Sequence, residues 1–154
     1  METTLTILKP DSVAAGNAGN ILAHLEKEGF QILALRKMRL TEAQARAFYE
    51  VHAERPFYQD LVAFMTSGPV IPAALERENA IAYLREVMGD TNSEKAAEGT
   101  VRALYGTNIE RNAIHGSDSP ENAQREMKIV KVAQNNFKKD ILEFYAQQKP
   151  TKAA

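Results

Sequence analysis

The sequence predicts one α/β domain, of the α+β kind, in which short apolar strands alternate with amphipathic helices. Three observations support this prediction. The chain of 154 residues has about the length of one domain, its apolar residues repeat with strand and helix periods in turn, and the connections are mostly short. Because neither an internal repeat nor a dividing linker occurs, we expect residues 1–154 to form one domain, with about 138–154 as a C-terminal extension or tail.

The first elements are a strand, a helix and a second strand. The run TTLTILK is β-branched and aliphatic and stops before Pro10, which predicts a strand with Lys9 at its C-terminal tip. Apolar residues at helical spacing predict a helix over about 20–28 that ends at Gly29. FQILALRKMRL predicts the second strand, on which successive side chains alternate between the two faces.

The middle of the chain predicts two helices and a third strand. Thr41 and Gln44 have the spacing of a capping box, which predicts a helix that continues to about Ala53. A short helix over about 58–65 ends at the breaker SGP, and VIPAAL predicts the strand. Pro72 has no N–H to donate, so we expect this strand to be exposed there or to carry a bulge.

The last third begins with a helix over NAIAYLREVMG, which places Arg85 on its apolar stripe and stops at Gly89. Between 90 and 112 the pattern is weak, and so long a connection in a compact domain is more often functional than idle. AIHG predicts a last short strand. A helix follows it, with Ser119 as N-cap and Pro120 as its first residue.

Composition excludes several classes of protein. The formal net charge of −1 and the pI of about 6.3 provide no basic field for nucleic acid or an anionic membrane. The chain has no cysteine, so disulfides, thiolate zinc sites and cysteine nucleophiles are excluded. No signal peptide and no apolar run of about 18 residues is present. We therefore expect a soluble, cytoplasmic protein that binds neither nucleic acid nor membrane.

No glycine-rich phosphate loop occurs, since both the P-loop and the G-x-G-x-x-G pattern are absent. A phosphate site would have to be built from side chains. Four cations stand at element ends or loop edges: Lys9, Arg55, Arg85 and Arg102. A guanidinium on a buried stripe, as expected for Arg85, needs an anionic partner. A structural ion pair or an exposed head group on a buried stem stays open for each of the four.

The three histidines differ in their surroundings. His24 belongs to a charged helix and reads as solvated surface, whereas His52 suits either the edge of the core or a ligand contact. His115 has small neighbours, including Ser117, and lies near a helix start that favours bound anionic charge. A catalytic role is one of the roles open to His115. A serine hydrolase is disfavoured because HGSDS lacks the G-x-S-x-G elbow, and no histidine pair indicates a metal site.

The segment NAIHGSDS resembles the signature of the nucleoside diphosphate kinases. TLTILKPD, FYEVHAERPFY, FMTSGPV, REVMGDTN and EGTVRA match further blocks in the family's order, so the resemblance runs from about Thr3 to Met127. It implies a ferredoxin-like βαββαβ fold, with a four-stranded antiparallel sheet and helices packed on it. It also implies a homo-oligomer, either a tetramer or a hexamer built from dimers.

The resemblance further implies transfer of the γ-phosphoryl group of a nucleoside triphosphate to a nucleoside diphosphate, by a ping-pong route through a phosphohistidine. His115 matches the nucleophile, Glu126 its carboxylate partner and Ser117 a hydroxyl that joins them. The matched nucleotide- and phosphate-binding positions are Lys9, Tyr49, His52, Arg55, Phe57, Arg85, Thr91, Arg102, Ile109 and Asn112. Within this set, Phe57 and Ile109 match an apolar clamp on the base, which implies broad base tolerance. Mg²⁺ is implied as a cofactor bound mainly through the nucleotide phosphates, with no protein ligand assigned.

Several positions depart from the family pattern. Ser93 and Glu98 stand where the family usually has proline, and Leu104 and Tyr105 where it has an Asp-Phe pair. These changes leave the rigidity of the loop and the oligomeric state open. The segment after Met127 lacks a common aromatic pair, and a longer C-terminal helix is one form that we consider for it.

Two alternatives to a kinase remain. One is a protein of this fold that binds nucleotide or a partner protein without turnover, and the other is a hydrolase that uses the same pocket. Every position assigned to chemistry retains a competent residue, which favours the kinase. From spacing alone, Glu126 is as consistent with an exposed helix acid as with a partner of His115.

Overall fold

The computed structural model describes residues 1–132, 142 and 144–148. The expected C-terminal extension and its longer helix fall largely outside these residues. Among the helices described, none is both long and apolar enough to cross a membrane.

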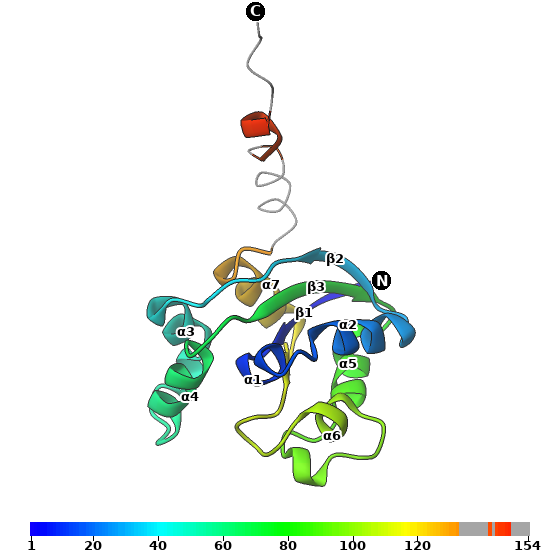
Figure 1. The fold of residues 1–154 in the computed structure, drawn as a ribbon, viewed down its shortest axis with the longest axis vertical. Coiled ribbons are helices and arrows are strands. Elements are labelled where there is room, and N and C mark those ends of the chain that lie inside the picture. The colour runs from blue at the N-terminus through cyan, green and yellow to red at the C-terminus, as the bar shows by residue number, and fades with distance from the viewer. Residues whose placement is uncertain (133–141, 143, 149–154) are drawn as a thin grey trace, which may run out of the picture.

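In the described part of the chain, four strands form one sheet in the order β2-β3-β1-β4, and all neighbouring strands are antiparallel. The strands are β1 (Glu2–Leu8), β2 (Gln31–Leu35), β3 (Ile71–Arg77) and β4 (Ile114–Gly116). The helices are α1 (Pro10–Ala14), α2 (Ala18–Lys27), α3 (Glu42–Phe48), the 3-10 helix η1 (Glu50–His52), α4 (Tyr58–Met65), α5 (Ala80–Met88), the 3-10 helix η2 (Ser93–Lys95), α6 (Val101–Tyr105) and α7 (Pro120–Ile129). The expected ferredoxin-like fold is confirmed (Figure 1).

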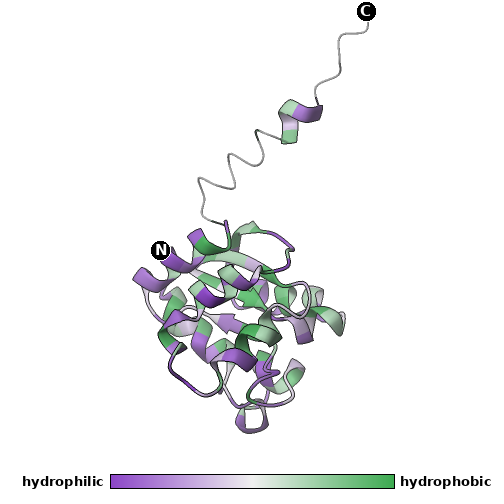
Figure 2. Ribbon diagram, turned by 90° about the vertical axis from the view of Figure 1, so that its left-hand side faces the viewer, coloured by the Kyte–Doolittle hydropathy of each residue, from purple (hydrophilic) through white to green (hydrophobic). Residues whose placement is uncertain are grey.

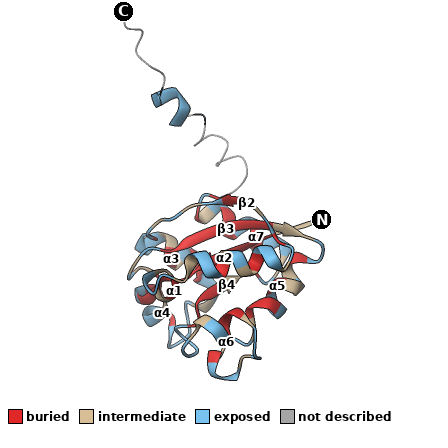
Figure 3. Cartoon of the chain, turned by 45° about the vertical axis from the view of Figure 1, so that its right-hand side comes forward, coloured by how far each residue is buried: buried red, intermediate tan, exposed pale blue. Residues whose placement is uncertain are grey.

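A separate apolar core covers each face of the sheet. Leu5 and Ile7 of β1 pack with α3, α4 and α7, whereas Leu8 packs on the other face with α2, α5 and α6. Met65 and Leu84 are fully buried members of the first and second core, respectively. Figure 2 shows hydrophilic and hydrophobic residues interspersed along the helices, and Figure 3 shows β3 buried along most of its length. Burial on both faces makes the sheet a rigid support for residues at its edge.

A bulge interrupts the pairing of β2 with β3. The register shifts between Ile32 and Ala34, so Leu33 is the extra residue. Ile32 packs against the α2 and α5 core, whereas Leu33 and Ala34 both pack on the α3, α4 and α7 side. The predicted alternation along this strand is therefore wrong at Leu33, because a bulge sets two residues of one strand against one of its partner.

Pro72 lies inside β3, is buried and pairs with Ile7 of β1. Its carbonyl accepts a hydrogen bond from the N–H of Arg36, one residue beyond the end of β2. In an antiparallel sheet the N–H and C=O of one residue point to the same neighbour. The missing donor of Pro72 therefore faces the space just past β2. The prediction that β3 is exposed or bulged at Pro72 is wrong. Pro72 is buried, and the bulge in the pairing of β2 with β3 is formed by Leu33 of β2.

The capping box that begins α3 is confirmed. Thr41 Oγ1 accepts from the Gln44 N–H, and the Gln44 side chain accepts from the Thr41 N–H. The helix ends at Phe48, however, and η1 follows, so the predicted extension to Ala53 is wrong. The last carbonyls of α3 accept hydrogen bonds from side chains of α4 and α7 instead of from a further helical turn.

Three short helical segments were not predicted. α1 begins directly after β1, with Lys9 as N-cap and Pro10 at its first position. The weak region 90–112 contains η2 and α6, and Thr100 caps α6 by accepting from the Ala103 N–H. Short helices of three to five residues give no apolar period long enough to detect. Among the departures from the family pattern, Ser93 is buried, whereas Glu98 and Leu104 are exposed.

The helix start after β4 is as predicted. Ser119 Oγ accepts from the Asn122 N–H, and Pro120 is the first residue of α7. Its buried face, which includes Ala123 and Met127, packs on the sheet beside β1. α7 therefore lies against β1, the strand that pairs with β4.

Candidate active site

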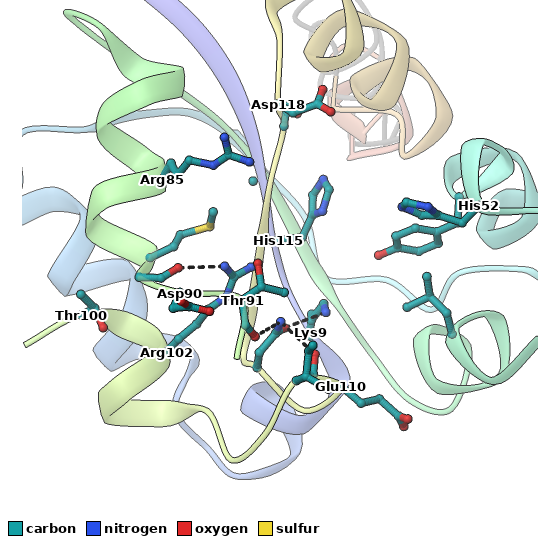
Figure 4. A pocket seen from close by; sticks show the side chains of 18 of the residues that line it. Lys9, His52, Arg85, Asp90, Thr91, Thr100, Arg102, Glu110, His115 and Asp118 are labelled. Carbon is teal, nitrogen blue, oxygen red and sulfur yellow. Dashed lines mark hydrogen bonds between the residues drawn. The ribbon is translucent and has the colours of Figure 1, made fainter. Parts of the chain in front are cut away.

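A cavity of about 1110 Å³ opens at the ends of β1 and β4 and is bounded by α4, α5 and α6. Of the residues predicted for the site, those that line it are Lys9, Tyr49, His52, Phe57, Arg85, Thr91, Arg102, Ile109, Asn112, His115 and Ser117. Figure 4 shows His115 in the middle, with Arg85 and Arg102 on one side and His52 on the other. The fold thus gathers side chains from positions 9 to 117 around one histidine.

His115 lies on β4 opposite Ile7, and its carbonyl accepts a hydrogen bond from Thr6 Oγ1 at 2.8 Å. Its Nε2 is 3.0 Å from Glu126 Oε1. The rings of Phe48 and Tyr49 approach the imidazole edge-on, at 4.9 and 6.3 Å between centroids. With Nε2 engaged by a carboxylate, Nδ1 is the ring nitrogen that keeps a free lone pair.

Glu126 is 4% exposed, and the same oxygen that meets His115 accepts a hydrogen bond from Ser117 Oγ at 3.0 Å. The carboxylate also lines a second cavity, of about 140 Å³, on the α7 side of His115. Glu126 is therefore a buried partner of the histidine and not the exposed helix acid that its spacing alone allowed. It lies two turns after the Ser119 cap, on the face of α7 that meets the sheet.

The backbone just before β4 is held in a sparsely populated conformation. Ala113 has φ of +72°, in the left-handed region that non-glycine residues adopt only at some energetic cost. Its N–H donates to Asp11 Oδ2 at 3.0 Å, and its carbonyl accepts from Ser12 Oγ and from the Lys9 N–H. Contacts from the start of α1 therefore determine how the chain enters β4 and where His115 lies.

Two of the predicted cations are buried. Lys9 is 7% exposed and donates to Asn112 Oδ1 at 2.7 Å, and Arg102 donates to the carbonyls of Gly89 and Ile114. Burial lowers the pKa of Lys9 to about 8, helped by the charge of Arg102. Burial also lowers the pKa of Arg102 to about 10. Neither cation has a salt bridge to a carboxylate within the described residues, so the cavity floor carries positive charge that an anion would stabilise.

The other two cations are exposed. Arg85 lines the cavity, but the buried positions of α5 include Leu84 and Met88, so the prediction that Arg85 lies on the buried stripe is wrong. Arg85 follows the buried Leu84 in α5, yet its side chain is exposed because the end of this helix borders the cavity. Arg55 lies in the turn between η1 and α4 and is not among the residues that line the cavity. The structure therefore does not bring Arg55 to the site with the other three.

The outer part of the cavity is apolar on two sides. Phe57 is 48% exposed and Ile109 is 64% exposed, and the ring of Phe57 lies 5.4 Å from that of His52. Asn112 is buried and donates to the carbonyls of Thr91 and Ile109, which fixes the 107–112 segment next to Lys9. Exposed apolar side chains at a cavity mouth are suited to a flat, apolar-faced ligand.

Two buried polar atoms near the cavity lack a hydrogen-bond partner within the described residues, namely the Tyr49 hydroxyl and Arg102 Nε. Burial, with the nearby charge of Glu126, also raises the pKa of Tyr49 well above its usual value. Both atoms can donate. An unpaired buried donor is costly, so each is suited to an acceptor supplied by a ligand.

The sequence analysis did not assign the acidic residues of the cavity, which are Asp60, Glu86, Asp90, Glu110 and Asp118. Asp118 stands in the HGSDS segment beside His115 and could have been found there, whereas the others carry no sequence signal. Within the described residues, no group of three or more His, Cys, Asp or Glu side chains could hold a metal ion. A divalent cation at this site would need most of its ligands from elsewhere.

Comparison with known proteins supplies independent evidence. The family described as "Nucleoside diphosphate kinase" matches residues 2–136. The chain is similar to the nucleoside diphosphate kinase of Persephonella marina, with 53% identity over 127 residues that cover 82% of this chain and 91% of that one. It is equally similar, at 53% identity over 142 residues, to that of Methylobacterium nodulans, which covers 92% of this chain and 98% of the relative.

Solved structures agree with the sequence relatives. The nucleoside diphosphate kinase of Aquifex aeolicus superposes with a TM-score of 0.81 at 52% identity, covering 84% of this chain and 94% of that one. That of Halobacterium salinarum, solved in complex with CDP, has a TM-score of 0.80 at 38% identity and covers 83% and 86% of the two chains.

Proposed function

This chain belongs to the nucleoside diphosphate kinase family and transfers phosphate between nucleotides, and we propose that it does so through a phosphohistidine on His115. The observation that carries the proposal is the contact between His115 Nε2 and the buried carboxylate of Glu126. A carboxylate there favours the tautomer with the proton on Nε2, which leaves the lone pair on Nδ1.

In the first half-reaction, the Nδ1 lone pair forms a bond to the γ-phosphorus of a nucleoside triphosphate. The bond from that phosphorus to the bridging oxygen breaks, and the nucleoside diphosphate leaves with the electron pair. The imidazole gains positive charge as the bond forms, and Glu126, held by Ser117, stabilises it. The second half-reaction reverses these steps with another diphosphate, so one nucleotide pocket serves both substrates.

The cations of the cavity position and neutralise the phosphates. Lys9 and Arg102 are buried without carboxylate partners within the described residues, and Arg85 extends into the cavity from α5. Phosphoryl transfer depends mainly on positioning and on charge stabilisation, which such cations supply. Tyr49 Oη and Arg102 Nε are buried donors without a partner within the described residues, and each would reach a phosphate oxygen only after its side chain moved. We also assign Arg55, Thr91 and His52 to phosphate binding, although Arg55 would have to reach in from the cavity's edge.

We place the base between Phe57 and Ile109, and the sugar hydroxyls near Lys9 and Asn112. Apolar contact with the faces of a base does not distinguish purines from pyrimidines, so we expect broad base tolerance. The CDP complex of the Halobacterium salinarum relative shows that a protein of this fold accommodates a cytosine nucleotide.

Mg²⁺ is the proposed cofactor. The isolated carboxylates of the cavity, among them Asp90 and Asp118, fit a cation that takes most of its ligands from phosphate oxygens and water. When bound, Mg²⁺ would neutralise charge on the phosphates. The residues of this chain then orient the nucleotide and supply the nucleophile.

We further propose a cytoplasmic homo-oligomer, either a tetramer or a hexamer, that is built from dimers. The lack of cysteine suits a reducing compartment. The sheet also leaves β2 at its edge, with Leu35 38% exposed. Light scattering on the purified protein would measure the assembly, and a monomer would contradict this part of the proposal.

One experiment separates the kinase mechanism from a hydrolase and from a protein that only binds nucleotide. The protein is incubated with a γ-³²P-labelled nucleoside triphosphate and Mg²⁺, and the chain is then isolated. We expect label that is lost in acid, is stable in base and maps to His115, and that passes to added nucleoside diphosphate. Release of inorganic phosphate without labelled protein would indicate a hydrolase, and the absence of both would indicate binding alone.

A further inference from the structure

Arg125 lies next to Glu126 on α7 and joins this helix to the end of α3. Its Nη1 donates to the carbonyl of Ala47 at 3.1 Å, and its Nη2 donates to the carbonyl of Phe48 at 3.3 Å. The last carbonyls of a helix have no partner within the helix and lie at the negative end of its dipole. Arg125 therefore caps α3 with a cation that belongs to a different element.

The two helices are also joined at the other end of their contact. Gln44 Nε2 of α3 donates to the carbonyl of Ile129, the last residue of α7. This bond holds the first turn of α3, whereas Arg125 holds the last one. Of the two links, the one made by Arg125 is the nearer to the residues that contact His115.

The end of α3 supplies the aromatic side chains that flank the histidine. Phe48 and Tyr49 meet the His115 ring edge-on, and the Phe48 and Tyr49 rings lie 4.9 Å apart in an edge arrangement. Arg125 binds the backbone of Phe48 itself, while its neighbour Glu126 binds His115 Nε2. Consecutive residues of α7 thus restrain the imidazole in two ways, one directly and one through α3.

A cavity lies beside the contact between α3 and α7. Phe48, Tyr49, His115, Arg125 and Glu126 all line the second cavity, of about 140 Å³. This second cavity is open to solvent, so the side chains that line it have no protein packed against them on that side. Without the bonds from Arg125, the end of α3 could shift toward this space and take the aromatic rings with it.

We propose that Arg125 is a positioning residue for phosphoryl transfer, because it fixes the α3 end whose aromatic rings set the orientation of the His115 imidazole. The role assigned to His115 rests on the proposed function. Arg125 donates to the carbonyls of Ala47 and Phe48 and does not line the large cavity in which the nucleotide is placed, so we infer that it acts through Phe48 and Tyr49.

The test compares Arg125→Met, which keeps an apolar stem and removes both donors, with Arg125→Lys, which restores one donor and the charge. Lys128→Met is the matched control, since Lys128 is an exposed cation of the same helix, with no side-chain hydrogen bond within the described residues. Three quantities are measured on the full chain: kcat and KM for a nucleoside diphosphate, the melting temperature, and the ¹⁵N NMR signals of the His115 ring in the nucleotide-free protein.

We expect Arg125→Met to lower kcat by about 5- to 50-fold with KM nearly unchanged, since small misplacements of reacting groups can cost about 100-fold. The ¹⁵N signals of the His115 ring should shift, because the Phe48 and Tyr49 rings would no longer hold the imidazole in one orientation. Arg125→Lys should recover part of both effects, and Lys128→Met should show neither. Either Arg125 variant supplies the comparison if the other one does not fold.

Wild-type kcat and unchanged His115 ring signals in a folded Arg125 variant would overturn the proposal. A lower melting temperature with both of those readouts unchanged would mean that Arg125 only stabilises the fold, which also overturns it. If the wild-type protein takes no label on His115, the proposed function fails instead. The NMR comparison then still decides whether Arg125 orients the ring.

Discussion

Replacement of Glu126 by glutamine tests the proposed mechanism where the structure is most explicit. Oε1 of Glu126 lies 3.0 Å from both His115 Nε2 and Ser117 Oγ. Glutamine keeps the shape and an acceptor oxygen but removes the negative charge. Its amide can also turn its NH₂ toward Nε2, which would favour the opposite tautomer, with the proton on Nδ1, and so block the nucleophile.

The separation allows an estimate of the effect. Two unit charges about 3 Å apart attract by roughly 5–6 kcal/mol at an effective dielectric constant of about 20. The imidazole ring spreads its charge over two nitrogens and carries only part of it in the transition state, so about half of that attraction, roughly 2–3 kcal/mol, is at stake. We therefore expect kcat to fall by about 30- to 150-fold, and further if the amide turns.

The assay measures kcat and KM for a nucleoside diphosphate, along with thermal melting. KM should hardly change, because Glu126 does not line the large cavity in which the nucleotide is placed. Glu121→Gln is the matched control, since Glu121 is an exposed acid in the first turn of the same helix. A folded Glu126→Gln protein with wild-type kcat would refute the reasoning, and another group would then have to orient His115.

Three further predictions concern the nucleophile, the base and the buried lysine. His115→Ala should abolish self-phosphorylation and transfer while nucleotide affinity, measured by calorimetry, stays within about threefold; retained label on the variant would contradict the assignment. With Phe57 and Ile109 as the base contacts, kcat/KM for purine and pyrimidine diphosphates should differ by no more than about 2–3 kcal/mol in transition-state free energy. A preference of about 10⁴-fold for one base would contradict this, since it would require a protein group that hydrogen-bonds to the base. Burial lowers the pKa of Lys9 from 10.5 to about 8. The unfolded chain therefore binds more protons between those values, and the free energy of unfolding of the nucleotide-free protein should gain up to about 3 kcal/mol as pH rises from about 8 to 10.5. Nucleotide affinity should fall over the same range as Lys9 loses its charge. Lys9→Met should lose this part of the pH dependence of stability. The free energy of unfolding is measured by denaturant titration at several pH values, and the same pH dependence in the variant as in the wild type would contradict the prediction for Lys9.

Local signals in the sequence predicted the elements that depend on local chemistry. The capping box of Thr41 and Gln44 and the Ser119 cap before Pro120 identified two helix starts, because such caps involve residues three or four positions apart. The helix over 58–65 was predicted from the breaker SGP that follows it, which is also a local signal. Elements too short for a full period, such as α1 and α6, left no comparable signal.

The tertiary structure decided every feature that depends on a distant partner. Leu33 becomes the extra residue of a bulge only when β2 pairs with β3, and the last carbonyls of α3 accept hydrogen bonds from Tyr58 and Arg125, which belong to α4 and α7. Arg85 turned out to be exposed and Arg102 buried. Which of two similar cations is buried depends on what packs over it and not on its neighbours in the chain.

The sequence by itself determined the order of the four strands and of the longer helices, the family resemblance, and eleven of the residues that line the cavity. The resemblance implied Glu126 as the partner of His115, but spacing alone could not determine that it is buried there, because position two turns into a helix does not say which face meets the sheet. Nor could it identify Arg125, whose bonds to Ala47 and Phe48 join positions 78 and 77 residues apart. Contacts of that kind exist only after the chain has folded, since each requires two helices to pack side by side on the same face of the sheet.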